Sequence, residues 1–386
     1  MENILSEIHH QTGYKHILLN KGVLEDSFHL SDFSTKNQKE IYCFLEDTFR
    51  KDVLERAINI VGSKRKLADK LGVSGDVVQG WTGGKFVRGQ KRIIPIPLYC
   101  LFYLGEIISE DSKFIESKII GLKCKSSNSK IVEAKFPIML SYDLGRLVGS
   151  SLGDGHITGN STLVYANKDE HLILCLKNLI RNLFNADSRI IDGSNQMKYL
   201  VVSAVVGKVA EEFGSPRKNK ILAENSGGLD LDKIYKATEE FKIGFLSAII
   251  DDEGCVRDDG RIKLKMRLRS VIELCRTTLE DRGIRVSKVF VENSKFFYIY
   301  FPVNDKIILR SPSKSKKLKI LLKEKRLRNT QDYFAVLKTL QPITTKLMAL
   351  NMGVKEHTVK YHVKKLIKLG CVSVDDNGVL SAGVKR

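Results

Sequence analysis

The sequence predicts an α+β protein built on an internal tandem repeat, with a helical module on either side of it. Two matches between the copies carry this prediction. The segment SPRKNKIL at 215–222 matches SPSKSKKL at 311–318, and LGRLVGSSLGDGHI has its counterpart in IGFLSAIIDDEGCV. Because these matches lie at nearly equal offsets of 96 and 99 residues, chance recurrence of short strings is a poor explanation.

The N-terminal region, residues 1–122, is predicted to be helical, with a helix-turn-helix at about 53–105. Residues 1–50 are weakly patterned and indicate no chemistry. From Val53 to Trp81 the pattern is helical, and a glycine-rich basic loop, GGKFVRGQKR, follows. A polar linker, KCKSSNSK at 123–130, separates this region from the repeat.

The two copies, 131–235 and 236–330, are each predicted to run helix, two strands, helix, two strands, helix. In the first copy STLVYAN is a strand, EHLILCLKNLIRNLF a helix and SRIIDGSNQMKYLVVSA a hairpin. In the second, CVRDDGRIKLKMRL and SKVFVENSKFFYIYFPV are hairpins around a helix from Ser270 to Arg282. Neither copy has enough apolar surface alone, so we expect the pair to share one pseudo-twofold core.

Net charge indicates the class of partner. The chain of 386 residues has 64 Lys and Arg against 45 Asp and Glu, a formal charge of +19 and a pI near 9.5. Such an excess attracts polyanions before any specific contact forms, although it says nothing about fold. Nucleic acid is therefore the expected partner.

Cysteine usage and hydropathy indicate a cytoplasmic protein. The seven cysteines include no C-x-x-C pair and most lie in apolar stretches, which favours reduced thiols over disulfides or a zinc site. The N-terminus lacks the pattern of a signal peptide. The longest apolar stretch, Ile93 to Leu104, contains two prolines and is too short to span a bilayer, so we expect no membrane partner.

Two nonapeptides open the repeat copies, LVGSSLGDG at 147–155 and LSAIIDDEG at 246–254. They resemble the signature motifs of the LAGLIDADG homing endonucleases in their two-motif, single-chain form. The resemblance implies that each motif is a helix and that the two helices pack side by side. Gly149, Gly153 and Ala248 supply the small residues that close packing requires, whereas Asp252 departs from the usual small residue.

The resemblance also places Asp154 and Glu253 at the C-terminal ends of the motif helices. Two carboxylates there, beside two negative helix ends, are unfavourable unless a cation joins them. Mg²⁺ is a hard cation that one or two carboxylates can hold while waters and phosphate oxygens complete its shell. We therefore expect both acids to be metal ligands and catalytic residues, since an acid is a poor choice merely to cap a helix C-terminus.

The shared tails supply basic residues. By the same resemblance, Lys218 and Lys314 fall near the lysines that the family places around its active sites. A lysine there stabilises charge developing on the phosphate. The alternative, which the sequence leaves open, is that both belong to ordinary basic surface that touches phosphates.

The second copy also predicts a DNA-binding sheet face. Five cations occupy every other position there, while Ile262, Leu264, Met266 and Leu268 alternate with them and are expected to point inward. Facing a duplex, such a row meets phosphates and guanine edges. The residues expected to contact DNA are Arg261, Lys263, Lys265, Arg267 and Arg269, with Asn167 and Lys168 in the comparable place of the first copy.

Two segments resemble helix-turn-helix units. Ala68, Gly72 and Val78 share their spacing with Ala349, Gly353 and Val359: alanine for a close helix crossing, glycine for the turn, valine to pack the second helix. The C-terminal unit, within 331–386, also resembles winged-helix domains, with a wing at 375–378. Its expected DNA contacts are Lys360, Tyr361 and Lys364. A helical scaffold for protein contacts is the alternative.

Together these observations predict Mg²⁺-dependent, sequence-specific cleavage of double-stranded DNA by a monomer at a long asymmetric site, one strand at each acid. The leading alternative is a transcription regulator that uses a LAGLIDADG scaffold only to bind DNA. Ser150 and Ser151 depart from the usual apolar motif centre and favour that alternative, whereas the presence of both acids favours the enzyme. An RNA-splicing maturase is a third possibility.

Overall fold

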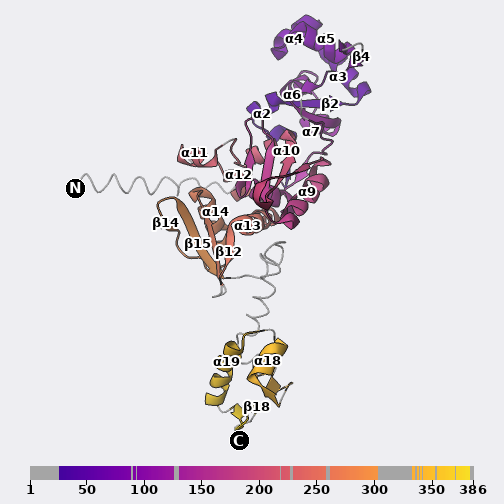
Figure 1. Cartoon of the computed structure of the whole chain (residues 1–386). Helices are drawn as coiled ribbons and strands as arrows, with labels where there is room; N and C mark the ends of the chain where they lie inside the picture. The colour runs from indigo at the N-terminus through magenta and orange to yellow at the C-terminus, as the bar shows by residue number, and fades with distance from the viewer. Residues whose placement is uncertain are drawn as a thin grey trace, which may run out of the picture. The chain divides into compact units, whose positions relative to one another are not determined.

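The computed structural model describes residues 26–87, 90–92, 94–125, 130–217, 219–226, 229–257 and 261–302, and 333–382 apart from 335–336, 339, 341, 353 and 370. The chain divides into two compact units, one of residues 1–254 with 264–299 and one of 255–263 with 300–386. Helices and small antiparallel sheets make up both (Figure 1), which confirms the α+β class. Within the described ranges no helix is long and apolar enough to cross a membrane.

The N-terminal region combines a helix cluster with a three-stranded sheet of order β5-β2-β6. In the turn between α4 and α5, Gly72 takes a left-handed φ of +66°, while Ala68, Val78 and Trp81 are buried beneath the two helices. The elements are β1 (Ser27–Phe28), α2 (Thr35–Glu40), β2 (Ile41–Leu45), α3 (Asp47–Val61), α4 (Lys64–Leu71), α5 (Gly75–Gly83), β3 (Lys85–Val87), β4 (Gln90–Arg92), β5 (Ile96–Pro97), α6 (Leu98–Ile107), α7 (Ser112–Ser117) and β6 (Ile119–Cys124).

The two repeat copies have the same strand order, β8-β9-β11-β10 in the first and β12-β13-β15-β14 in the second. The closing helix expected for the second copy lies outside the described residues. After β7 (Ile138–Met139), the first copy contains α8 (Tyr142–Leu152), β8 (Gly155–Ile157), β9 (Leu163–Asn167), α9 (Glu170–Phe184), β10 (Arg189–Asp192), β11 (Lys198–Val202) and α10 (Ala204–Glu212). Two short helices, α11 (Lys220–Asn225) and α12 (Asp232–Lys236), lead to α13 (Glu239–Glu253), β12 (Gly254–Val256), β13 (Arg261–Met266), α14 (Arg269–Glu280), β14 (Phe290–Glu292) and β15 (Phe296–Pro302).

Ion pairs join the N-terminal region to the first copy. Glu40 accepts hydrogen bonds from the fully buried Lys208 of α10 and from Arg217, whose Nη2 lies 2.8 Å away. Burial alone raises the pKa of Glu40, but these bonds outweigh it and lower that pKa to about 2. Arg217 also donates to Glu211 at 2.8 Å. Arg217, in the segment after α10, is thus held both by Glu40 of the N-terminal region and by Glu211 of α10.

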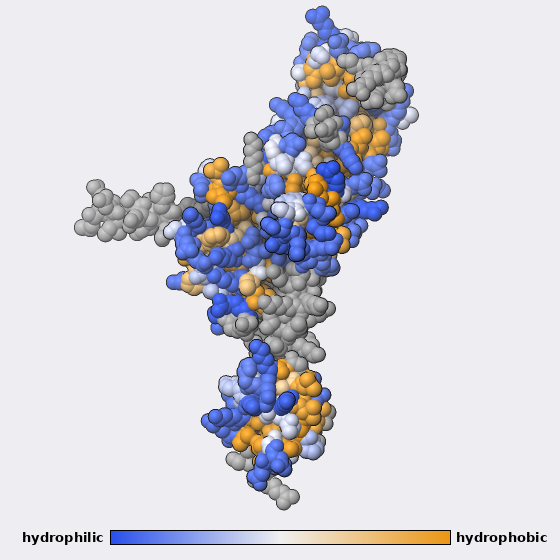
Figure 2. Space-filling model, in the orientation of Figure 1, coloured by the Kyte–Doolittle hydropathy of each residue, from blue (hydrophilic) through white to orange (hydrophobic). Residues whose placement is uncertain are grey.

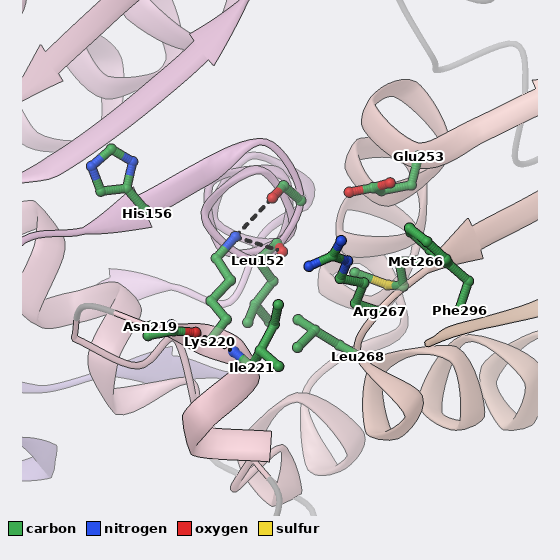
Figure 3. Close-up of a pocket in the computed structure, with 11 residues that line it drawn as sticks. Leu152, His156, Asn219, Lys220, Ile221, Glu253, Met266, Arg267, Leu268 and Phe296 are labelled. Atoms are coloured by element: carbon green, nitrogen blue, oxygen red, sulfur yellow. Dashed lines mark hydrogen bonds between the residues drawn. The ribbon is translucent and has the colours of Figure 1, made fainter. Parts of the chain in front are cut away.

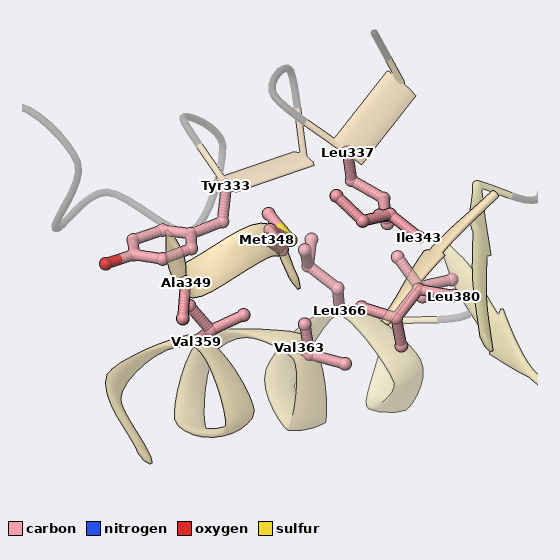
Figure 4. Packing of buried hydrophobic residues seen from close by; sticks show 10 residues of the cluster. Tyr333, Leu337, Ile343, Met348, Ala349, Val359, Val363, Leu366 and Leu380 are labelled. Atoms are coloured by element: carbon pink, nitrogen blue, oxygen red, sulfur yellow. The ribbon is translucent and has the colours of Figure 1, made fainter. Parts of the chain in front are cut away.

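In the described part of the C-terminal module, helices α18 and α19 pack with a three-stranded sheet of order β16-β18-β17. Its elements are β16 (Ile343–Thr344), α18 (Thr345–Met352), α19 (Glu356–Lys368), β17 (Val372–Val374) and β18 (Val379–Ala382). Figure 4 shows its core, in which Met348, Val359 and Leu366 interdigitate with Leu337 and Leu380. The hairpin between β17 and β18 turns at the expected wing, where the Asp375 side chain accepts from the backbone of residues 377 and 379.

Hydropathy separates surface from core in both units. In Figure 2 hydrophilic residues cover most of the visible described face, and apolar residues show mainly between them. On the C-terminal module apolar residues also reach the surface, and Leu350 of α18 is 78% exposed.

Candidate active site at the paired helix ends

Helices α8 and α13 lie side by side, as the resemblance implied. Small residues four apart on α8 face α13: a Cβ added to Gly145 would lie 2.0 Å from the Phe241 carbonyl oxygen, and one on Gly149 2.7 Å from the Cβ of Ala248. Residues four apart form one ridge on a helix surface, so these small residues let the backbones of α8 and α13 approach closely along that ridge. The close approach brings the C-terminal ends of both helices to one place.

Asp154 follows directly on the end of α8, with its side chain exposed. Its Oδ2 accepts a hydrogen bond of 2.8 Å from the side-chain amide of Asn167, the last residue of β9. The same amide also reaches the Tyr165 hydroxyl at 3.2 Å. The structure therefore brings Asn167, expected to contact DNA, into contact with the candidate metal ligand.

Asp252 belongs to the second copy but forms hydrogen bonds with residues of the first. Its Oδ1 accepts from the Tyr165 hydroxyl at 2.6 Å and its Oδ2 from the backbone N–H of Asp154 at 3.2 Å. Gly153 makes room for it, because a Cβ there would lie 2.3 Å from Oδ2. Burial and the neighbouring Asp154 raise the pKa of Asp252 well above its usual range. This acid, a departure from the motif, connects the two copies.

Lys220 is one of the two cations of the site. Its ammonium donates to the carbonyl oxygens of Leu152 at 2.8 Å and Gly153 at 2.7 Å, where the negative end of α8 favours positive charge. Burial lowers the pKa of Lys220 to about 8, against the charges of Glu253, Asp252 and Asp154, which raise it. One lysine therefore interacts electrostatically with three carboxylates from the two motifs.

A pocket of about 640 Å³ opens between the helix ends (Figure 3). Glu253, half-buried at the end of α13, lines it together with Lys220 and Arg267. In Figure 3 the Arg267 guanidinium points into the pocket, the Lys220 ammonium is directed at the end of α8, and Phe296 lies beside Met266 on the pocket wall. Burial and then the Lys220 charge lower the pKa of His156, another lining residue. The pocket thus combines an acid, two cations and an apolar wall, the groups that a nucleotide phosphate and base require.

A buried ion pair supports the paired helices one turn below the pocket. Arg146 of α8 donates to Asp251 of α13 at 3.0 Å, and both side chains are nearly inaccessible to solvent. A charge buried without its partner is costly, so this pair fixes which faces of the helices meet.

Several expected site residues are placed differently from the sequence hypothesis or lie beyond the structure. Lys218 and Lys314 lie outside the described residues. The expected inward residues Ile262, Leu264, Met266 and Leu268 are buried. Strand β13 ends at Met266, so Arg267 lies in the bend that follows and Arg269 begins α14. Exposed or half-exposed positions are held by Arg261, Lys263, Lys265, Arg267, Arg269, Asn167, Lys168, Lys360, Tyr361 and Lys364.

Three contributions to the site were not predicted from the sequence. Lys220 lies in the same tail as Lys218, but the sequence offered several lysines and no means of ranking them. Tyr165 is a strand residue by sequence pattern, and only the fold shows it beside Asp252. The outward aromatic residues of β14 and β15 were expected only as strand formers.

Similarity to known sequences is limited. No protein-family model matches the chain. Among curated proteins, one component of the A-type ATP synthase of Pyrococcus abyssi (strain GE5 / Orsay) is 23% identical over 219 residues, 49% of this chain. The chain covers only 21% of that relative's length.

Among solved structures, the chain is similar to the homing endonuclease I-DmoI in complex with DNA and Ca, at 18% identity over 47% of this chain and 98% of that one, with a TM-score of 0.35. An I-DmoI variant with its target DNA in the presence of Mg gives 17% identity over 44% and 94%, with a TM-score of 0.32. Full-length DUF199/WhiA from Thermatoga maritima gives 10% identity over 60% and 91%, with a TM-score of 0.34.

Proposed function

We propose that the chain is a metal-dependent endonuclease that cleaves double-stranded DNA at a long asymmetric sequence. The observation that carries the proposal is the meeting of the Asp154 and Glu253 motif ends around Lys220, which interacts with the acids of both helices. Stability alone does not require three carboxylates at two negative helix ends. A lysine with a lowered pKa that faces acids of both motifs beside one pocket is typical of catalytic sites.

The residues present fit Mg²⁺. Glu253 offers carboxylate oxygens to the pocket, and the exposed Asp154 follows directly on Gly153, which lines it. Among the described residues no group of three or more His, Cys, Asp or Glu side chains is arranged to hold a metal ion. One or two carboxylates completed by substrate phosphates are nevertheless the usual set for Mg²⁺.

When bound, the metal polarises the phosphoryl oxygen and activates a water. The chain's own residues do the rest. Lys220 and Arg267 place positive charge in the pocket where the phosphate gains negative charge. Asn167 donates to the Asp154 carboxylate, which orients it before substrate arrives, and the backbone N–H of Asp154 donates to Asp252, which holds the backbone of the first acid.

The regions that flank the repeat extend the proposed contact with DNA over a long target site. We propose four domains, residues 1–122, 131–235, 236–330 and 331–386, that bind along one duplex as a monomer. The α4–α5 and α18–α19 pairs act as helix-turn-helix modules. On the exposed face of α19, Lys360 pairs with Glu356 at 2.9 Å, while Lys365 lies 4.8 Å from the Tyr361 ring. Lys364 and Tyr361 are the groove candidates there.

The test is cleavage of a randomised and genomic duplex library with Mg²⁺, followed by sequencing of the cut ends. Asp154→Asn and Glu253→Gln remove one candidate ligand each, and Glu280→Gln, exposed at the end of α14 and outside the expected DNA contacts, is the matched control. Staggered cuts at one site, made by the wild type and the control, with each ligand variant cutting at most one strand, support the proposal. Equal, specific retention of duplex without cutting by all four proteins contradicts it and favours a DNA-binding regulator.

A further inference from the structure

The outward face of strands β14 and β15 carries aromatic rings, in the same sheet as strand β13, whose exposed face was expected to be basic. Phe290 pairs directly with Tyr298 across the two strands, and their rings are stacked with centroids 5.2 Å apart and planes 19° from parallel. Phe296 lies two residues from Tyr298 and so on the same face. All three rings are half-exposed, while Ile299 on the other face is fully buried. The core therefore does not account for the outward rings.

Cations surround these rings. The ammonium of Lys265 lies 4.6 Å from the Phe296 ring centre and the guanidinium of Arg267 5.1 Å from it. Lys288 lies 5.7 Å from the centre of Phe290. Lys265 also pairs with Glu292 at 2.6 Å, which holds its ammonium beside the strands. Rings interleaved with cations match a strand that presents flat bases between phosphates.

The first copy does not share this face. Its outward positions on β10 and β11, the strands that correspond to β14 and β15, hold Arg189, Ile191 and Val201 around a single aromatic residue, Tyr199. Tyr199 corresponds to Tyr298 at the 99-residue offset of the repeat. In a continuous duplex the base faces are covered by their neighbours, so a protein that only followed the groove would have no use for rings on one half.

The ring face is continuous with the pocket at the helix ends. Phe296 and Arg267 line that pocket together with Lys220 and Glu253 (Figure 3). A base lying on Phe296 would thus bring its own phosphate towards Arg267 and Lys220. We propose that the face formed by Phe290, Phe296 and Tyr298 binds unpaired nucleobases, so that the second copy takes a strand whose bases are extruded or single-stranded. This inference deepens the proposed function, on which the role of the neighbouring acids rests.

Binding without metal tests the inference. Fluorescence anisotropy in EDTA compares four labelled oligonucleotides of one mixed sequence: a duplex, the duplex with three central unpaired nucleotides, the single-stranded DNA and the single-stranded RNA. We expect the unpaired probes to bind about tenfold or more tightly than the duplex, and the two single strands show which sugar is preferred. Duplex binding equal to or tighter than that of every unpaired probe overturns the inference.

Substitutions then locate the face. Phe296→Leu and Tyr298→Leu keep apolar volume but remove a stacking ring, and we expect each to weaken binding of the preferred unpaired probe about tenfold, much more than it weakens binding of the duplex. Tyr199→Leu, at the corresponding position of the first copy, is the control and leaves both unchanged. Equal weakening on paired and unpaired probes, or no weakening, overturns the inference. Circular dichroism shows whether each variant is folded.

A variant that fails to fold is replaced by cross-linking of the wild-type chain. A single strand carrying 5-iodouracil, irradiated in the complex, yields an adduct on Phe290, Phe296 or Tyr298 by peptide mass spectrometry if the inference holds. Adducts confined to other residues overturn it. Failure of the proposed endonuclease is a separate result, since it appears as absent cleavage while the binding preference persists.

Discussion

Replacing Gly145 by alanine tests the packing that brings the two motif helices together. The added methyl would lie 2.0 Å from the carbonyl oxygen of Phe241 and 3.0 Å from its Cα, whereas ordinary contact begins near 3.4 Å. These opposing atoms belong to the backbone, so a change of rotamer cannot relieve the clash. The helices must move apart by about 1 Å, and gaps of that size forfeit a large part of the dispersion attraction along the interface.

The expected magnitude follows from two opposing effects. Overpacking costs about 1–3 kcal/mol, and a clash with rigid backbone belongs at the upper end of that range. Alanine recovers about 0.5–1 kcal/mol because it is a better helix former than glycine. We therefore expect the free energy of unfolding to fall by about 2 kcal/mol, which corresponds to a Tm lower by about 5 °C. Gly149→Ala, where the nearest backbone atom is 2.6 Å away, should cost less.

Urea unfolding followed by far-ultraviolet circular dichroism measures the loss. Trp81, the single tryptophan, is buried in the N-terminal region, so its fluorescence reports on that region separately. Gly75→Ala is the matched control: Gly75 is helical and nothing lies within 4 Å of its added methyl, so stability should stay equal or rise. If Gly145→Ala is as stable as the wild type or the control, the close approach of α8 and α13 is refuted.

Three further predictions test neighbouring contacts. Asp251→Leu removes the carboxylate that pairs with the buried Arg146, and we expect the free energy of unfolding in urea to fall by about 3–5 kcal/mol. Adding Arg146→Met should restore much of that loss; strictly additive losses in the double variant would contradict the pairing. Because the pKa of Glu40 is lowered to about 2, its stabilisation is present above pH 4.5 and is lost as the pH falls towards 2. In thermal unfolding recorded across this pH range, Glu40→Gln should lack that acid-dependent loss of stability. If the pH dependence of its Tm equals that of the wild type, Glu40 is not the stabilising group. Asp252→Ala and Tyr165→Phe should slow cutting of one strand, so that nicked circles accumulate; equal slowing of both strands would speak against a local role.

Features set by local pattern were predictable from sequence, and features set by register were not. Strand β13 was predictable because alternation assigns Ile262 and Leu264 to the core without knowledge of any neighbour. The contact of Gly145 with Phe241 depends on how α8 and α13 are rotated against each other. That rotation is fixed by the whole shared core, so no single motif encodes it.

The choice of lysine shows the same limit. The tail after α10 offers several basic residues, and their order in sequence does not rank them. Lys220 faces the helix ends because the segment before it is fixed. The Ser215 hydroxyl is hydrogen-bonded to that of Ser151 in α8, and the backbone of Arg217 forms a β-bridge with Ile157, the last residue of β8. These contacts lie more than 50 residues apart in the chain, beyond the reach of periodicity.

The asymmetry of the two acid sites follows from one pair of positions. Gly153 and Asp252 correspond in the repeat, and Asp252 requires glycine at 153, since any side chain there would collide with the carboxylate opposite. Asp252 accepts one of its hydrogen bonds from the Tyr165 hydroxyl, and the counterpart of Tyr165 99 residues on is Leu264, whose side chain has no polar group. The second site therefore cannot repeat the network of the first. A symmetric dimer of one copy could not hold glycine and aspartate at the same position, so the tandem chain is what allows two chemically different sites, suited to an asymmetric target.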